Sequence, residues 1–116
     1  MTRIRMDKVY YMAVHRWNKI ISVIDEYIRT KPNVDLREFL DWDRDRCIYC
    51  VLFGTCENCP IKKYTQNSQC DETPWYDVNQ FIIEDSPIKA RIHAIQLRDL
   101  ILRAKPKNMM EIVSYS

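Results

Sequence analysis

Residues 6–28, MDKVYYMAVHRWNKIISVIDEYI, carry the strongest periodic pattern in this chain of 116 residues. Apolar residues recur there at alternating intervals of four and three, which places them on one face of an α-helix. This face consists of Met6, Tyr10, Ala13, Trp17, Ile20, Ile24 and Tyr27. Because the residue before a proline disfavours the helical conformation, Pro32 should end the helix soon after Arg29. The pattern predicts one long amphipathic helix.

A second long helix is expected near the other end of the sequence. Ser86 and Pro87 combine a preferred N-cap residue with a proline at the first helical position, and Pro106 should end the helix. The helix should therefore run from about 87 to 104. Its predicted apolar face consists of Ile88, Ile92, Ile95, Leu97, Leu100, Ile101 and Ala104.

Shorter elements are expected around these two helices. Asp35 should be the N-cap of a short helix. The apolar side of that helix would hold Leu36, Phe39, Leu40 and Trp42. Residues 75–83 favour either another helix or a short extended piece, and the tail of about 105–116 is either a short strand or a loose end.

These elements together predict a mainly α fold in one domain, residues 1–116. The chain has only one glycine, which argues weakly against a sheet-rich fold because sheets need glycine in their turns and bulges. We expect the two long amphipathic helices to pack together. The short helix and an irregular cysteine-rich loop of about 47–75 would cap one end.

All five cysteines of the chain lie in that loop. Cys47 and Cys50 form one Cys-x-x-Cys pair, Cys56 and Cys59 form a second, and Cys70 follows. Thiols confined to one short segment suggest a shared metal or covalent crosslinks. Four thiolates complete the tetrahedral shell of a structural zinc ion, so four of the five are candidate ligands. The spacer between the pairs is short, so one pair could instead join Cys59 and Cys70.

Two alternatives to zinc remain open. Iron–sulfur clusters also use four cysteines at short spacings, and the Cys59-Pro60 step occurs in bacterial ferredoxins. Two disulfides with one free thiol are the other alternative. The N-terminal residues lack the apolar core of a signal peptide, and no apolar run is long enough to span a membrane. We therefore expect a cytoplasmic protein, where thiols more often bind metal than form disulfides. His15 and His93 are weaker candidate ligands.

Basic residues supply candidate contacts to nucleic acid. The net charge is only +2, but both ends of the chain are basic while the segment that enters the cysteines is acidic. The candidates are Lys62, Lys63, Lys89, Arg91, Arg98 and Arg103. Such residues can neutralise phosphates, although a solvated helix face is the preferred explanation for those on the last helix. No phosphate-binding glycine loop, nucleophile elbow or zinc-deaminase signature is present, so we do not expect an enzyme.

The cysteine pattern resembles that of small cysteine-rich proteins of phages, viruses and other mobile elements. The matching residues are His15-Arg16-Trp17, the two cysteine pairs with Pro60, Cys70, and Pro74-Trp75-Tyr76, within about residues 10–77. The resemblance implies a viral or mobile-element accessory protein in which all five cysteines belong to one centre, and it implies no reaction.

We therefore predict a small binding protein with a structural zinc site. Its partner would be nucleic acid or a host protein. The alternative is a protein-interaction module, for which a homodimer is one form, that acts through its apolar helix faces.

Overall fold

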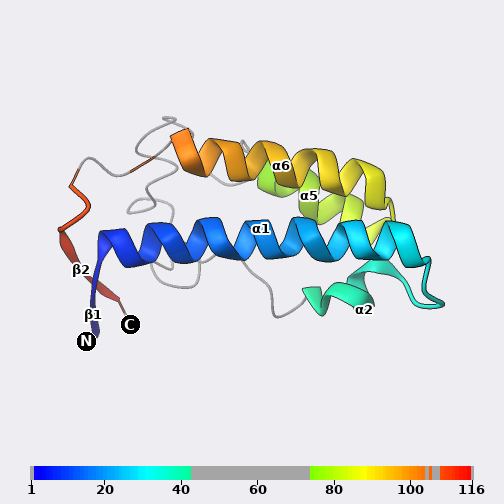
Figure 1. The fold of residues 1–116 in the computed structure, drawn as a ribbon, viewed down its shortest axis with the longest axis horizontal. Coiled ribbons are helices and arrows are strands. Elements are labelled where there is room, and N and C mark those ends of the chain that lie inside the picture. Colours follow the sequence, from blue (N-terminus) through cyan, green and yellow to red (C-terminus); the bar gives the residue numbers. More distant parts are fainter. Residues whose placement is uncertain (1, 43–73, 104, 106–107, 116) are drawn as a thin grey trace.

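The computed structural model describes residues 2–42, 74–103, 105 and 108–115 (Figure 1). The elements are β1 (Thr2–Arg5), α1 (Met6–Thr30), α2 (Leu36–Leu40), α5 (Pro74–Ile83), α6 (Pro87–Arg103) and β2 (Ile112–Tyr115). The two long helices, α1 and α6, lie side by side and run in opposite directions. The prediction of a mainly helical fold built on two packed long helices is confirmed.

Helix α1 forms where the sequence pattern places it. Its predicted apolar face is buried throughout, from Met6 to Tyr27. The helix ends at Lys31, which adopts a left-handed conformation with φ 47° and donates its backbone N–H to the carbonyl of Tyr27. Pro32 follows at once, so the chain cannot continue as a helix.

Helix α2 is capped as the sequence predicts. The carboxylate of Asp35 accepts a hydrogen bond of 2.8 Å from the backbone N–H of Glu38, which satisfies a donor of the first turn. Leu36, Leu40 and Trp42 are buried and Phe39 is half-buried. Helix α2 thereby packs against both α1 and α5, near the C-terminal end of α1 (Figure 1).

Helix α5 begins within the range that was predicted to be an irregular loop. Of the two states predicted for residues 75–83, the helix is the one that forms, and it begins one residue earlier, at Pro74, which the prediction places in the irregular segment. Proline suits that position because its missing N–H has no partner in a helix start. Val78 and Ile82, four residues apart, are fully buried against the core.

Helix α6 has the predicted bounds, and Leu97 and Ile101 are buried as predicted, but the rest of its buried face differs from the prediction. Its buried residues are Ala90, Ala94, Leu97 and Ile101. Ile88 and Ile92, predicted for the core, are exposed instead. Each lies two residues from a buried alanine, about 200° around the helix. The alanines have short side chains, which suit the side of α6 that packs between α1 and α5.

The two ends of the described chain pair as strands. Strand β1 runs antiparallel to β2, and Ile4 lies opposite Val113. The pairing continues into α1, because Met6 and Asp7 donate their backbone N–H groups to the carbonyls of Glu111 and Met109. The tail therefore contains the short strand that was one of its two predicted states. Its partner at the N-terminus was not predicted.

Candidate functional site

The cysteines and two of the basic candidates lie outside the described residues. These are Cys47, Cys50, Cys56, Cys59, Cys70, Lys62 and Lys63. Within the described ranges there is no group of three or more His, Cys, Asp or Glu side chains that could hold a metal ion. The zinc, iron–sulfur and disulfide hypotheses therefore remain predictions about the segment between Trp42 and Pro74.

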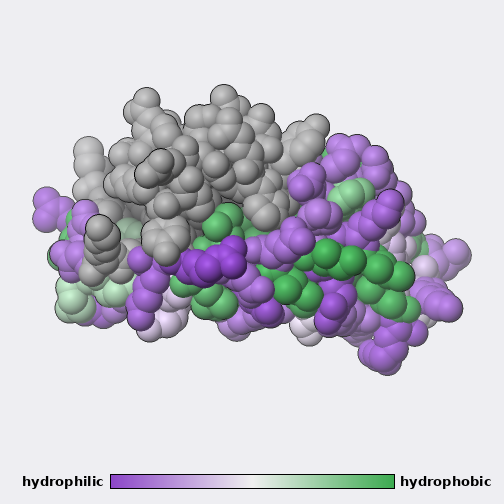
Figure 2. Space-filling model, turned by 90° about the horizontal axis from the view of Figure 1, so that it is seen from above, coloured by the Kyte–Doolittle hydropathy of each residue, from purple (hydrophilic) through white to green (hydrophobic). Residues whose placement is uncertain are grey.

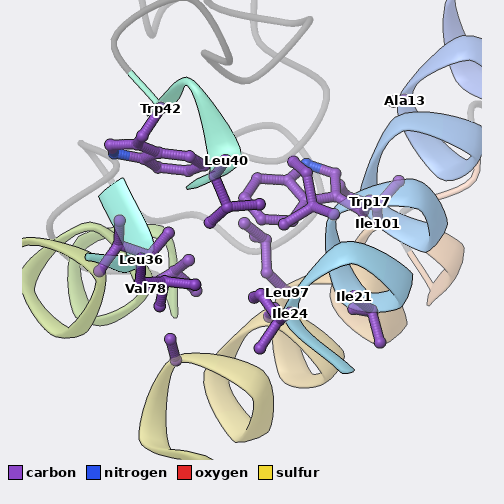
Figure 3. Packing of buried hydrophobic residues seen from close by; sticks show 14 of the residues in the cluster. Ala13, Trp17, Ile21, Ile24, Leu36, Leu40, Trp42, Val78, Leu97 and Ile101 are labelled. Carbon is purple, nitrogen blue, oxygen red and sulfur yellow. The ribbon is translucent and has the colours of Figure 1, made fainter. Parts of the chain in front are cut away.

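The described residues on either side of the cysteine segment are hydrogen-bonded to each other. Trp42, the last described residue before it, donates its indole N–H to Oδ1 of Asn79 in α5 at 2.8 Å. Its ring also packs edge-on against Trp17 of α1, with 6.3 Å between the ring centroids (Figure 3). The segment thus leaves and rejoins the described fold at elements that contact each other, so core packing meets part of the entropy cost of bringing its two ends together.

Trp17 is central to this packing. Its side chain is fully buried, among the hydrophobic residues that Figure 3 shows between α1, α2 and α6. Its indole N–H has no acceptor among the residues that the structure describes. The contribution of Trp17 to the described core is therefore apolar contact rather than hydrogen bonding.

Asp85 connects three segments of the chain through hydrogen bonds: α1, α2 and its own turn. Its Oδ1 accepts hydrogen bonds from the Tyr27 hydroxyl at 2.8 Å and from the backbone N–H of Leu36 at 2.9 Å. Asp85 adopts a left-handed conformation with φ 57°, in the turn between α5 and α6. Burial raises the pKa of Tyr27 above its ordinary value, and the Asp85 and Asp35 carboxylates raise it further. Sequence patterns did not single out this aspartate.

The four basic candidates on α6 do not form one surface. Nε of Arg91 pairs with Oδ1 of Asp25 in α1. Arg98 lies 3.3 Å from both Asn18 of α1 and Asp99. Those two arginines therefore point along the α1 side of the helix, and each has a carboxylate partner. Such pairing lowers the positive potential that a phosphate backbone would meet.

The other two basic candidates lie at opposite ends of α6. The ammonium group of Lys89 is 5.5 Å from the centroid of the Phe81 ring, on the α5 side. Arg103 is exposed at the last position of the helix. Within the described residues, no carboxylate pairs with either of them at ion-pair distance.

The two histidines are placed apart. His15 is exposed on α1. His93 stacks on Phe81 with 5.1 Å between ring centroids, and its Nδ1 lies 3.1 Å from the Gln96 side-chain oxygen. The Asp77 carboxylate is 3.7 Å from the same nitrogen. His93 thus has a packing role between α5 and α6, the ordinary outcome for a lone helical histidine.

The most distinctive surface feature is an apolar stripe on the outside of α6. We call Ile88, Ile92, Ile95 and Leu102 the outer stripe. Three of its members are strongly exposed, at 64% for Ile88, 49% for Ile92 and 43% for Leu102, and Ile95 is half-buried. Figure 2, which views the molecule from the α6 side, shows hydrophobic side chains reaching the surface between hydrophilic ones. Helix α6 therefore presents apolar residues in two opposite directions.

Comparison of the chain with protein-family models, curated proteins and solved structures finds no match. Among the described helices, none combines the length and the apolar character that crossing a membrane requires.

Proposed function

We propose that this chain is a non-catalytic binding protein that contacts another protein through the outer stripe of α6. One observation carries the proposal. The buried face of α6 already supplies the core with Ala90, Ala94, Leu97 and Ile101, yet a second apolar face remains in solvent. Single exposed apolar residues need no explanation, but several aligned on one helix face are typical of interaction sites.

The cysteine centre belongs to the same proposal. Four of the five cysteines between α2 and α5 would hold a structural zinc ion. The fastened flanks of the segment support this, because Trp42 and Asn79 hold the two entry points at one place. A zinc ion would then cross-link a loop that the helical core already closes. The setting that the cysteine pattern resembles is a viral or mobile-element accessory protein.

Nucleic-acid binding is the weaker candidate for the described surface. Arg91 and Arg98 are paired with Asp25 and Asp99, and Lys89 lies against an aromatic ring. Lys62 and Lys63 would have to supply the contacts that α6 does not.

Binding of an apolar dye to the folded protein tests the proposal. We expect the wild-type chain to enhance the fluorescence of 8-anilinonaphthalene-1-sulfonate without loss of near-UV circular dichroism. The I88S/I92S double variant should keep its circular dichroism and lose most of the enhancement. Val34→Ser, which removes an exposed apolar side chain away from α6, is the control. If the double variant binds dye as the wild type does, the outer stripe is not an accessible apolar surface and the proposal fails.

A further inference from the structure

Resting on the proposed function, we infer that the partner at the outer stripe is an acidic amphipathic helix of another protein. The shape of the stripe, the charges at its two ends and the consequences of self-pairing all point to this partner.

The spacing of the stripe matches a helical partner. Ile88, Ile92 and Ile95 follow one another at intervals of four and three residues. The next position of this pattern is Asp99, and Leu102 occupies the one after it. Alternating intervals of four and three form the seam along which two helices pack. From Ile88 to Leu102 the stripe extends about 21 Å at 1.5 Å per residue. That length suits a partner helix of about four turns laid along α6.

The charges at the two ends of the outer stripe indicate that the partner is negatively charged. Lys89 adjoins Ile88 at one end of the stripe, and Arg103 adjoins Leu102 at the other. Neither has a carboxylate partner among the described residues. Asp99 lies between Ile95 and Leu102, but Arg98 pairs with it and offsets its charge. A partner with a Glu or Asp near each end would therefore meet, at both ends, a cation that has no carboxylate partner within the described part of the chain.

The same charges disfavour a second copy of α6 as the occupant. In an antiparallel pair, Lys89 of one copy would meet Arg103 of the other. In a parallel pair, each of these residues would meet its own equivalent. Both orientations bring like charges together at both ends of the stripe, and flanking charges of this kind decide which helices pair.

Two synthetic peptides test the inference with the full-length chain. Both are about three heptads long with leucine at the a and d positions, and they differ only in carrying glutamate or lysine at e and g. Fluorescence anisotropy should show binding of the glutamate peptide and weakening at high salt. I88S/I92S should abolish it. K89E/R103E should weaken it about tenfold and improve binding of the lysine peptide, because two attractive pairs become repulsive. Lys19→Glu, an exposed charge reversal on α1, should change neither.

The other outcomes overturn either the acidic-helix partner alone or the proposed protein-binding function as well. Absence of glutamate-peptide binding, or equal binding of both peptides, overturns the inference. Self-association in sedimentation equilibrium that I88S/I92S abolishes also overturns it, because a second copy is then the occupant, although the proposed protein-binding function survives. A loss of thermal stability in I88S/I92S overturns both, because the stripe is then covered by the chain itself.

Discussion

The hydroxyl oxygen of Tyr27 lies 2.8 Å from Oδ1 of Asp85, although the two residues are 58 positions apart in the sequence. The same carboxylate oxygen accepts the backbone N–H of Leu36. One side chain in the turn between α5 and α6 therefore holds the last turns of α1 and the first turn of α2. These hydrogen bonds connect the C-terminal end of α1 and the start of α2 to the turn between α5 and α6.

Removing the Asp85 carboxylate should destabilise the fold, because the backbone N–H of Leu36 loses its acceptor and the Tyr27 hydroxyl keeps only the Val34 carbonyl. We expect Asp85→Gly to lower the free energy of unfolding by about 1–3 kcal/mol, since glycine adopts the left-handed conformation freely. Asp85→Ala should cost about 1 kcal/mol more, because alanine is strained at that φ. Asp85→Asn, which keeps an oxygen acceptor and tolerates the conformation, should cost least. Urea unfolding checks this order, and a glycine variant as stable as the wild type would contradict it.

Alkaline pH should weaken the protein through Tyr27. Its pKa in the folded state is raised by burial first and by Asp85 and Asp35 next, whereas the unfolded chain titrates near the ordinary value of 10.0. Above pH 10 the unfolded state releases this proton first, so the stability that Tyr27 contributes is intact below that pH and is lost as the pH rises through the folded pKa.

Tyr27→Phe isolates this effect from the titration of lysines. The stability of the variant should fall less steeply between pH 9 and pH 11 than that of the wild type. Parallel pH curves for Tyr27→Phe and the wild type would refute the assignment.

The bond between Trp42 and Asn79 should stabilise the base of the cysteine segment. Asn79→Ala leaves a buried indole N–H without its acceptor, so we expect a loss of about 1–3 kcal/mol. Trp42→Phe removes the donor, and adding Asn79→Ala to it should cost little more. Gln80→Ala, one residue along α5 and exposed, is the matched control. Additive effects in this double-mutant cycle would show that the bond contributes nothing.

Metal removal should destabilise the protein if the cysteine prediction is correct. Elemental analysis of freshly purified protein is expected to find zinc, and a chelator should lower the melting temperature. Cys→Ser at four of the five positions should do the same, while the spare cysteine should tolerate the change. Visible absorption with bound iron would instead identify a cluster. The absence of both metals, together with a single free thiol per chain, would identify two disulfides.

The sequence predicted the elements whose signals are local. Each of these signals lies within a few residues of the structure that it specifies. They are the apolar face of residues 6–28, the cap at Asp35 and the helix start at Ser86-Pro87. The carbonyl of Ser86 accepts the backbone N–H of Ala90, so the helix begins where its cap signal stands. Such patterns need no knowledge of the tertiary fold.

The errors concern choices that only the assembled fold makes. Isoleucines were preferred over alanines for the core side of α6, because hydrophobicity ranks them higher. The space between α1 and α5 instead takes Ala90 and Ala94, and Ile88 and Ile92 remain outside. The role of Asp85 depends on Tyr27 and Leu36, which are distant in sequence. Strand β1 has only four residues, too few to show a period of two. The cysteine centre stays a prediction, because it lies outside the described residues.

Thermal stability distinguishes the buried face of α6 from its outer stripe. Leu97→Ala removes a fully buried side chain and should cost about 2–5 kcal/mol, whereas I88S/I92S should stay within about 0.5 kcal/mol of the wild type. Melting of both variants by circular dichroism gives the answer. A melting temperature for I88S/I92S as low as that of Leu97→Ala would show that both faces belong to the core and would contradict the account.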